Sequence, residues 1–87
     1  MNTLQKRNYD AVVARGLITK ETTDKQFLNK LEEDFYEAMA ECDDDTFRLM
    51  SELADVITVC TCWMIHRGYD PDVLLRRCAE KNEKRIK

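Results

Sequence analysis

Glycine and proline are scarce in this 87-residue chain, which contains two Gly and one Pro. So few helix breakers, together with 44% hydrophobic and 36% charged residues, are typical of a helical protein and not of a disordered one. The sequence also lacks a run of about 18 apolar residues, and its start, MNTLQKRNYD, lacks the apolar region of a signal peptide. We therefore expect an all-α protein of the cytoplasm that does not enter a membrane.

Basic residues are not in excess, since 14 Lys and Arg stand against 17 Asp and Glu, for a net charge of −3. A nucleic-acid-binding module needs a basic surface to neutralise phosphates, so this balance argues against one. The length fits a single domain over residues 1–87, whose own hydrophobic core would be marginal. A second copy of the chain is therefore a plausible partner.

Four cysteines occur, at Cys42, Cys60, Cys62 and Cys78. They lie among apolar residues with helical spacing and without a secretion signal, which favours reduced thiols packed in a core over disulfides. Cys60 and Cys62 are two positions apart, so on a helix their side chains point about 200° apart and cannot share a metal ion.

Apolar periodicity and turn residues predict four helices, over residues 3–15, from residue 23 or 24 to about 42, from 46 to about 67, and from 71 to the C-terminus. Gly16 and Gly68 are natural C-terminal stops. Asp45 and Asp70 are the expected N-caps of the last two helices, and Pro71 suits a first helical position.

The second and third predicted helices differ in their apolar pattern. In the second, the apolar residues fall within about 120°, which predicts one buried face made of Phe27, Leu28, Leu31, Phe35, Ala38, Met39 and Cys42. In the third, apolar residues surround the helix, which is typical of a central helix or one sandwiched against a partner. We therefore expect a homodimer or homotetramer.

Acidic residues crowd the segment between residues 31 and 55, where Arg48 is the only basic residue. Asp34 and Glu37 are three residues apart in one helix, and so are Glu52 and Asp55 in the next, so each pair shares a side of its helix. One interpretation is a solvated face, because charge runs usually mark surface. The other is a divalent cation such as Mg²⁺, since an antiparallel hairpin would bring the pairs together as a four-carboxylate cage.

The motifs EDFYE at residues 33–37 and ELAD at residues 52–55 resemble the EExxE and ExxD pair of the MazG-like all-α nucleotide pyrophosphohydrolases. The similarity extends through ELADVITVCTCWMIHRGYDPDVLLRRCAEKNEKRI and back to RGLITKETTDKQFLNKLEED, so that it covers about residues 15–86. It implies a four-helix MazG-like bundle that hydrolyses nucleoside or deoxynucleoside triphosphates to the monophosphate and pyrophosphate with Mg²⁺, or Mn²⁺ in its place.

Carried across residue by residue, the resemblance implies that Asp34, Glu37, Glu52 and Asp55 are the metal ligands. Glu33 becomes a further ligand or the residue that positions the attacking water, so that Glu33 and Glu37 are the catalytic candidates. Asp34 stands where the family usually has Glu, and Cys62 where many members have Asn.

Cationic residues are the candidates for contacts with the substrate phosphates: Lys81, Lys84 and Arg85 near the C-terminus, and Lys30 one turn before the acidic motif. The C-terminal group could equally be a solvated helix end. Lys30 could reach a phosphate or pair with Glu33 or Asp34.

Other residues and a rival function stay open on the sequence alone. Tyr36 and Trp63 could stack on a base, although core or interface packing is the commoner role of such residues, and His66 is expected to be structural or at the surface. The rival function is a catalytically inactive helical protein whose acidic strip binds a basic partner.

Overall fold

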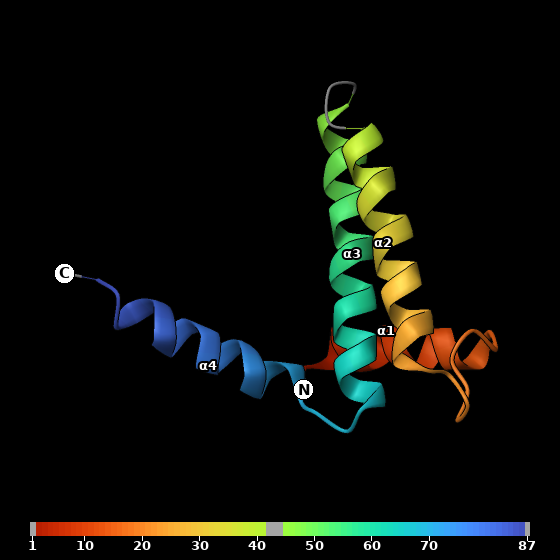
Figure 1. The fold of residues 1–87 in the computed structure, drawn as a ribbon, viewed down its shortest axis with the longest axis horizontal. Coiled ribbons are helices and arrows are strands. Elements are labelled where there is room, and N and C mark those ends of the chain that lie inside the picture. The colour runs from red at the N-terminus through yellow and green to blue at the C-terminus, as the bar shows by residue number, and fades with distance from the viewer. Residues whose placement is uncertain (1, 42–44, 87) are drawn as a thin grey trace.

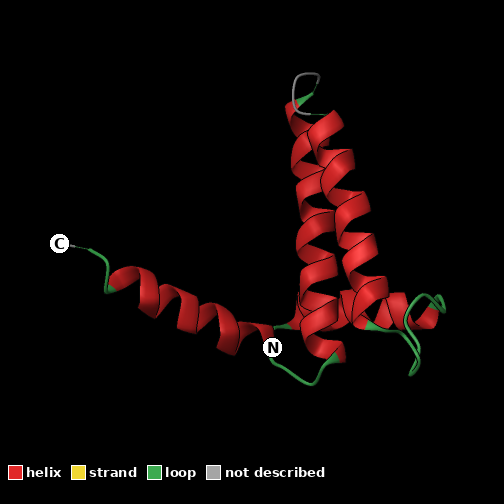
Figure 2. Cartoon of the chain, in the orientation of Figure 1, coloured by secondary structure: helices red, strands yellow, loops and turns green. Residues whose placement is uncertain are grey.

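The computed structural model describes residues 2–41 and 45–86, and these residues form helices and loops without a strand (Figures 1 and 2). The helices are α1 (Thr3–Ala14), α2 (Asp24–Ala40), α3 (Thr46–His66) and α4 (Pro71–Glu83). The all-α class is thus confirmed. Cys42, Asp43 and Asp44, which the sequence places at the end of the second helix and in the turn after it, lie outside the described residues.

Side-chain caps explain where the helices begin. Asp45 Oδ1 accepts from the backbone N–H of Phe47 at 2.9 Å, and Asp70 caps α4 with Pro71 in the first turn, as predicted. At the start of α2 the cap is Thr23, which forms a reciprocal capping box with Gln26. Each of these helices is therefore started by a local signal that is visible in the sequence.

Helices α2 and α3 form an antiparallel hairpin, and α1 runs across the base of this hairpin at a steep angle (Figure 1). The central hydrophobic cluster lies where the three helices meet, and consists of Ile18, Phe27 and Cys62, with Tyr9, Val12 and Trp63 packed around it. The cluster thus fixes α1 and the loop after it against the hairpin.

Aromatic contacts reinforce this junction. The Phe27 and Trp63 rings stack with centroids 5.7 Å apart, and the His66 ring lies 5.2 Å from Phe27. Trp63 Nε1 donates to Asp24 Oδ1 at 2.8 Å, and His66 Nε2 donates to the Thr22 carbonyl at 3.1 Å. Trp63 and His66 therefore tie the end of α3 to the start of α2, which is a structural role.

Helix α4 projects away from the other three helices and packs only on the end of α3 (Figure 1). Among the described residues it touches neither α1 nor α2, although Pro71 at its start is fully buried. The Cα radius of gyration, 14.6 Å, exceeds the roughly 12 Å of a compact chain of this length. The four-helix bundle implied by the resemblance is therefore not closed within a single chain.

The single buried face expected for the second helix is wrong in part. Phe27 and Ala38 are buried, but Leu28, Phe35 and Met39 are each about half exposed. The predicted arc is wider than the strip that contacts α3, so only one edge of it enters the core.

Helix α3 is apolar on two sides and is long and apolar enough, by length and composition alone, to cross a membrane. One side is buried against α1 and α2, where Val59 and Cys62 lie. The other side carries the exposed residues Met50, Leu53 and Ile57. The high hydropathy of α3 thus arises from two apolar strips, one in the core and one exposed.

Candidate functional site

A cavity of about 520 Å³ lies between the hairpin, the end of α1 and the loop that follows α1. Asp34 and Glu37 from α2 and Asp55 from α3 line it, together with the cations Arg15 and Lys30. The hairpin therefore brings three of the four predicted metal ligands to one cavity. We call this the acidic cavity.

Asp34 is the most deeply buried carboxylate of the acidic cavity, with 4% of its surface exposed. Lys30 Nζ lies 3.4 Å from Asp34 Oδ1 and 3.6 Å from Glu33 Oε1. A buried carboxylate needs such a partner, because burial of a charge without one is costly. Lys30 thus pairs with both acidic residues proposed for it, and Glu33 lies mostly exposed beside them.

Glu52, the fourth predicted ligand, lies next to Glu37 across the hairpin. Burial raises the pKa of the Glu52 carboxyl, and repulsion from Glu37 and then Asp55 raises it further. Its Oε2 atom is shielded from solvent and has no hydrogen-bond partner within the described structure. Ionisation of Glu52 is therefore disfavoured where it stands.

Glu41 extends the acidic group by one further turn of α2, although in the sequence it has the pattern of an ordinary solvated residue. Its side chain is only 20% exposed and lies 3.5 Å from Arg48 Nη2 of α3. Its Oε2 atom, like that of Glu52, is shielded and without a partner in the described part of the chain. Glu41 follows Glu37 by four residues, about one helical turn, and this spacing is the sequence feature that places the two on the same side of α2.

The described residues contain no group of three or more His, Cys, Asp or Glu side chains gathered closely enough to hold a metal ion. The donor chemistry nevertheless suits a hard cation, because carboxylate oxygens are the ligands that Mg²⁺ prefers. The shielded, unpartnered oxygen of Glu52 beside Glu37 is a place where positive charge would relieve repulsion. The residues thus fit Mg²⁺ in chemistry, while their side chains are not arranged around one point.

The far side of the acidic cavity is apolar, with Val12, Ile18, Phe27 and Cys62 among its lining residues. Thr22 and Gln26 add polar groups between the two ends. Sequence patterns did not reveal Arg15, Thr22 and Gln26, because they come from the C-cap of α1, a loop and the start of α2, and meet only in the fold. Of the three, Gln26 stands in a recognisable motif, the capping box with Thr23, but that motif predicts the start of a helix and not a cavity.

The basic residues Lys81, Lys84 and Arg85 lie on the last turn of α4 or just after it, and all three are exposed. Because α4 contacts only α3, the chain does not bring these cations to the acidic cavity. Within one chain, Arg15 and Lys30 are the cations that line it.

The cysteines follow their predicted environment only in part. Cys62 is buried, Cys60 is half-buried, and burial raises the pKa of both thiols. Cys78 is exposed, so its predicted place in a core is wrong, because α4 leaves the bundle. Tyr36 is also exposed, and its ring meets Phe35 edge-on at 6.0 Å.

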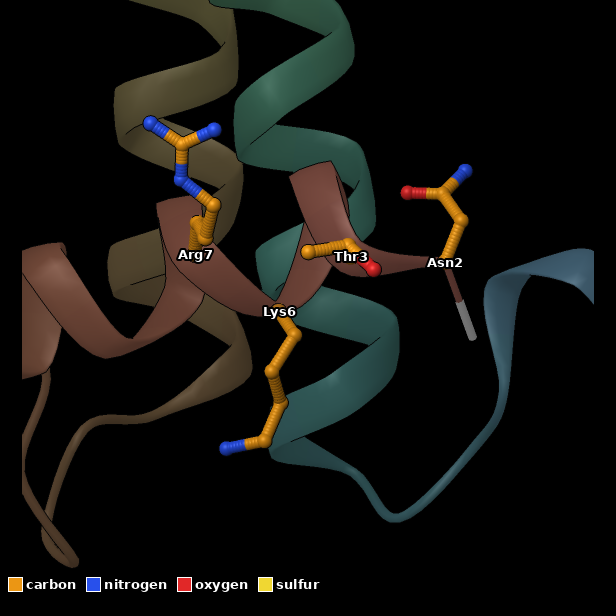
Figure 3. Close-up of a pocket in the computed structure, with 4 residues that line it drawn as sticks. All are labelled: Asn2, Thr3, Lys6 and Arg7. Carbon is orange, nitrogen blue, oxygen red and sulfur yellow. The ribbon is translucent and has the colours of Figure 1, made fainter.

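A second, shallow hollow lies at the start of α1, lined by Asn2, Thr3, Lys6 and Arg7 (Figure 3). Lys6 and Arg7 point in different directions there, and Lys6 Nζ pairs with Asp10 Oδ1 at 2.8 Å. Its side chains do not converge on a common point, so the acidic cavity is the candidate functional site.

Comparison of the chain with protein-family models, with curated proteins and with solved structures gives no match.

Proposed function

We propose that this protein is a Mg²⁺-dependent pyrophosphohydrolase that converts nucleoside or deoxynucleoside triphosphates to the monophosphate and pyrophosphate. The observation that carries the proposal is the convergence of Asp34, Glu37 and Asp55 from two helices on one cavity. Beside it, Glu52 is held near Glu37 with a raised pKa and one oxygen that has no partner among the described residues. Such an arrangement is costly without a cation, and costly arrangements of charge are typical of functional sites.

The shape and lining of the acidic cavity suit this substrate class. Its volume of about 520 Å³ falls within the range of small-molecule sites, roughly 300–1,000 Å³. One end offers charged groups for a polyphosphate with its ions, and the other offers apolar side chains for a nucleoside. A ligand with both an ionic and an apolar part matches both ends.

The residues divide into distinct roles. Asp34, Glu37, Glu52 and Asp55 would hold the metal, and Glu33, beside Asp34, or Glu37 would orient and deprotonate the attacking water. Bound Mg²⁺ would supply positive charge to the phosphates and make water a better nucleophile. Lys30 holds the Asp34 carboxylate by its ion pair, and Arg15 and Lys30 provide positive charge along the cavity for phosphate oxygens.

The direct test is pyrophosphate release from a mixture of NTPs and dNTPs with Mg²⁺ or Mn²⁺. We expect release by the wild type and a loss of at least about a hundredfold in Glu52→Gln, since a metal ligand is removed. Glu32→Gln, an exposed carboxylate of α2 outside the acidic cavity, is the matched control and should keep its activity. Equal rates in wild type and Glu52→Gln would refute the proposal.

The rival function, an inactive protein that docks a basic partner on its acidic strip, makes a different demand on the structure. Docking requires accessible carboxylates, whereas Asp34 is almost fully buried and paired with Lys30. Glu41 and Glu52 also keep one shielded oxygen each. Glu33, Glu37 and Asp55 are exposed and could meet a basic partner, but the burial of Asp34 is accounted for by the enzymatic proposal alone.

A further inference from the structure

The α2–α3 hairpin has a second large face on which apolar side chains are left uncovered. Six of them are between 39% and 63% exposed: Leu28, Phe35, Met39, Met50, Leu53 and Ile57. We call these six residues the bare face. Scattered exposed apolar residues are normal, but a contiguous group of this kind marks an interaction surface.

Helical geometry places the six residues together. At 100° per residue, the three on α2 fall within an arc of about 40° and the three on α3 within about 60°. The carboxylates of the acidic cavity lie at least about 100° further around each helix. The two stripes therefore adjoin on the side of the hairpin that faces away from the acidic cavity.

The core of one chain is small. The buried hydrophobic residues of the described chain are Ile18, Phe27, Ala38, Val59 and Cys62, together with the fully buried Pro71. Domains of this size are marginal even with a larger core. Covering the exposed side chains of the bare face would add to the apolar surface that is buried.

We infer that the bare face is covered by the bare face of a second copy of this chain, so that two hairpins form a four-helix bundle across a two-fold axis. The α3 stripe continues from Met50, Leu53 and Ile57 to the half-buried Cys60 and Met64, with alternating steps of three and four residues. This is the spacing of helices that pack side by side with other helices. The inference does not depend on the proposed catalytic function.

The chemistry of the bare face suits a copy of itself. A two-fold contact brings each residue type near the same patch of the partner, which is unfavourable where like charges face each other. All six residues are uncharged, so no such repulsion arises. At roughly 100 Å² each, they offer on the order of 600 Å² of apolar area, which with their flanking residues approaches the roughly 800 Å² per partner of a standard interface.

Two other occupants fit less well. The chain's own α4 leaves from the end of α3, and its residues Val73 and Leu75 are themselves about half exposed. A lipid bilayer would have to accommodate α3 with Glu52 and Asp55 in its middle, and charges there are costly. A second hairpin meets neither difficulty, and it leaves the two acidic cavities on opposite outer sides of the dimer, open to substrate.

The first test is the mass in solution, by size-exclusion chromatography with light scattering between about 1 and 100 μM. We expect the wild type to have at least twice the mass of one chain, and Ile57→Glu to raise the dissociation constant by at least about a hundredfold. Leu4→Glu changes an exposed leucine of α1, outside the bare face, and should leave the mass unchanged. A wild type that is a monomer at every concentration would overturn the inference.

A second measurement covers the outcome in which Ile57→Glu fails to fold. A photo-crosslinking amino acid is placed at Ile57 of the purified full chain, and at Lys20 in the exposed loop as the control. We expect covalent dimers from position 57 and not from position 20. Intramolecular crosslinks from position 57 to α4, or flotation of the protein with phosphatidylcholine vesicles, would contradict the inference by identifying another occupant.

Discussion

At the residue scale, Glu52 shows how the fold holds a carboxylate in an unfavourable state. It stands between Glu37 and Asp55, and one of its oxygens is shielded without a partner among the described residues. A group whose pKa is higher in the folded than in the unfolded chain binds more protons when folded, so stability falls as the pH rises through that range. Ionisation of Glu52 therefore lowers the stability of the metal-free protein as the pH rises.

We predict that Glu52→Gln raises the thermal midpoint of the metal-free protein at pH 7. The substitution removes the repelled charge, and its amide group can donate to Glu37. The gain should shrink as the pH falls and disappear below the ordinary pKa of about 4.5, where Glu52 is protonated in both states. Thermal denaturation between pH 4 and 8 with a chelator present measures this, with Glu32→Gln as the exposed control. A constant gain across the whole range would show that the charge of Glu52 is not what destabilises the fold.

Lys30 is the counterpart of Glu52, because it compensates a buried charge. Lys30→Met keeps the aliphatic stem but leaves the Asp34 carboxylate, 5% exposed, without its ion pair. We predict a loss of about 1–3 kcal/mol in the free energy of unfolding, moderated by the exposure of Lys30 itself. The double variant Lys30→Met with Asp34→Asn should recover part of this loss, which urea unfolding of all four proteins in a double-mutant cycle would measure. Additive losses would mean that the pair does not interact.

At the scale of the helices, local signals explain most of what could be predicted. The caps Thr23, Asp45 and Asp70 and the stops Gly16 and Gly68 were readable, because each satisfies backbone groups within a few residues. Both glycines have positive φ, 76° and 86°, which other residues rarely adopt. The ends of the first three helices were accordingly predicted to within about two residues, whereas α4 ends at Glu83, short of the predicted C-terminus.

Packing between helices was less predictable, for a physical reason. The apolar arc of α2 showed which residues avoid water but not which neighbour covers them, so Leu28 and Phe35 were assigned to a core that one chain does not provide. The same holds for α4, whose direction depends on a loop of few residues after Gly68. In the acidic cavity, spacing predicted the proximity of Asp34, Glu37 and Asp55, whereas Arg15 and Gln26 required the tertiary structure.

The cap of α3 allows a prediction at this scale. Asp45 Oδ1 accepts from the N–H groups of Phe47 and Arg48, at 2.9 and 3.3 Å. We predict that Asp45→Ala costs about 1 kcal/mol of stability, as the loss of an N-cap usually does, and that Asp45→Ser restores most of it. Urea unfolding followed by circular dichroism would measure both. An equal loss in the two variants would show that the charge of Asp45, and not its capping geometry, is what matters.

At the scale of the whole molecule, α4 is the element whose purpose the single chain leaves open. It contacts only α3, so its loss should affect the other three helices little. We predict that a chain ending at Leu75, which retains the buried Pro71, unfolds at nearly the same temperature as the full chain. A drop of more than about 10 °C, which for a chain of this size corresponds to roughly 2 kcal/mol, would show that α4 packs elsewhere, in this chain or in a partner.

The basic end of α4 can be tested separately from its packing. Lys81, Lys84 and Arg85 are exposed and do not reach the acidic cavity of their own chain, so changing all three to Gln should leave the thermal midpoint unchanged. If these cations bind the substrate phosphates from a neighbouring copy, KM for the triphosphate should rise by at least about tenfold while kcat changes little, because only a binding contact is lost. The matched control is Lys6→Gln, an exposed cation of α1 outside the acidic cavity. Unchanged KM and kcat in the triple variant would assign the phosphate contacts to Arg15 and Lys30 and leave the end of α4 as a solvated helix terminus.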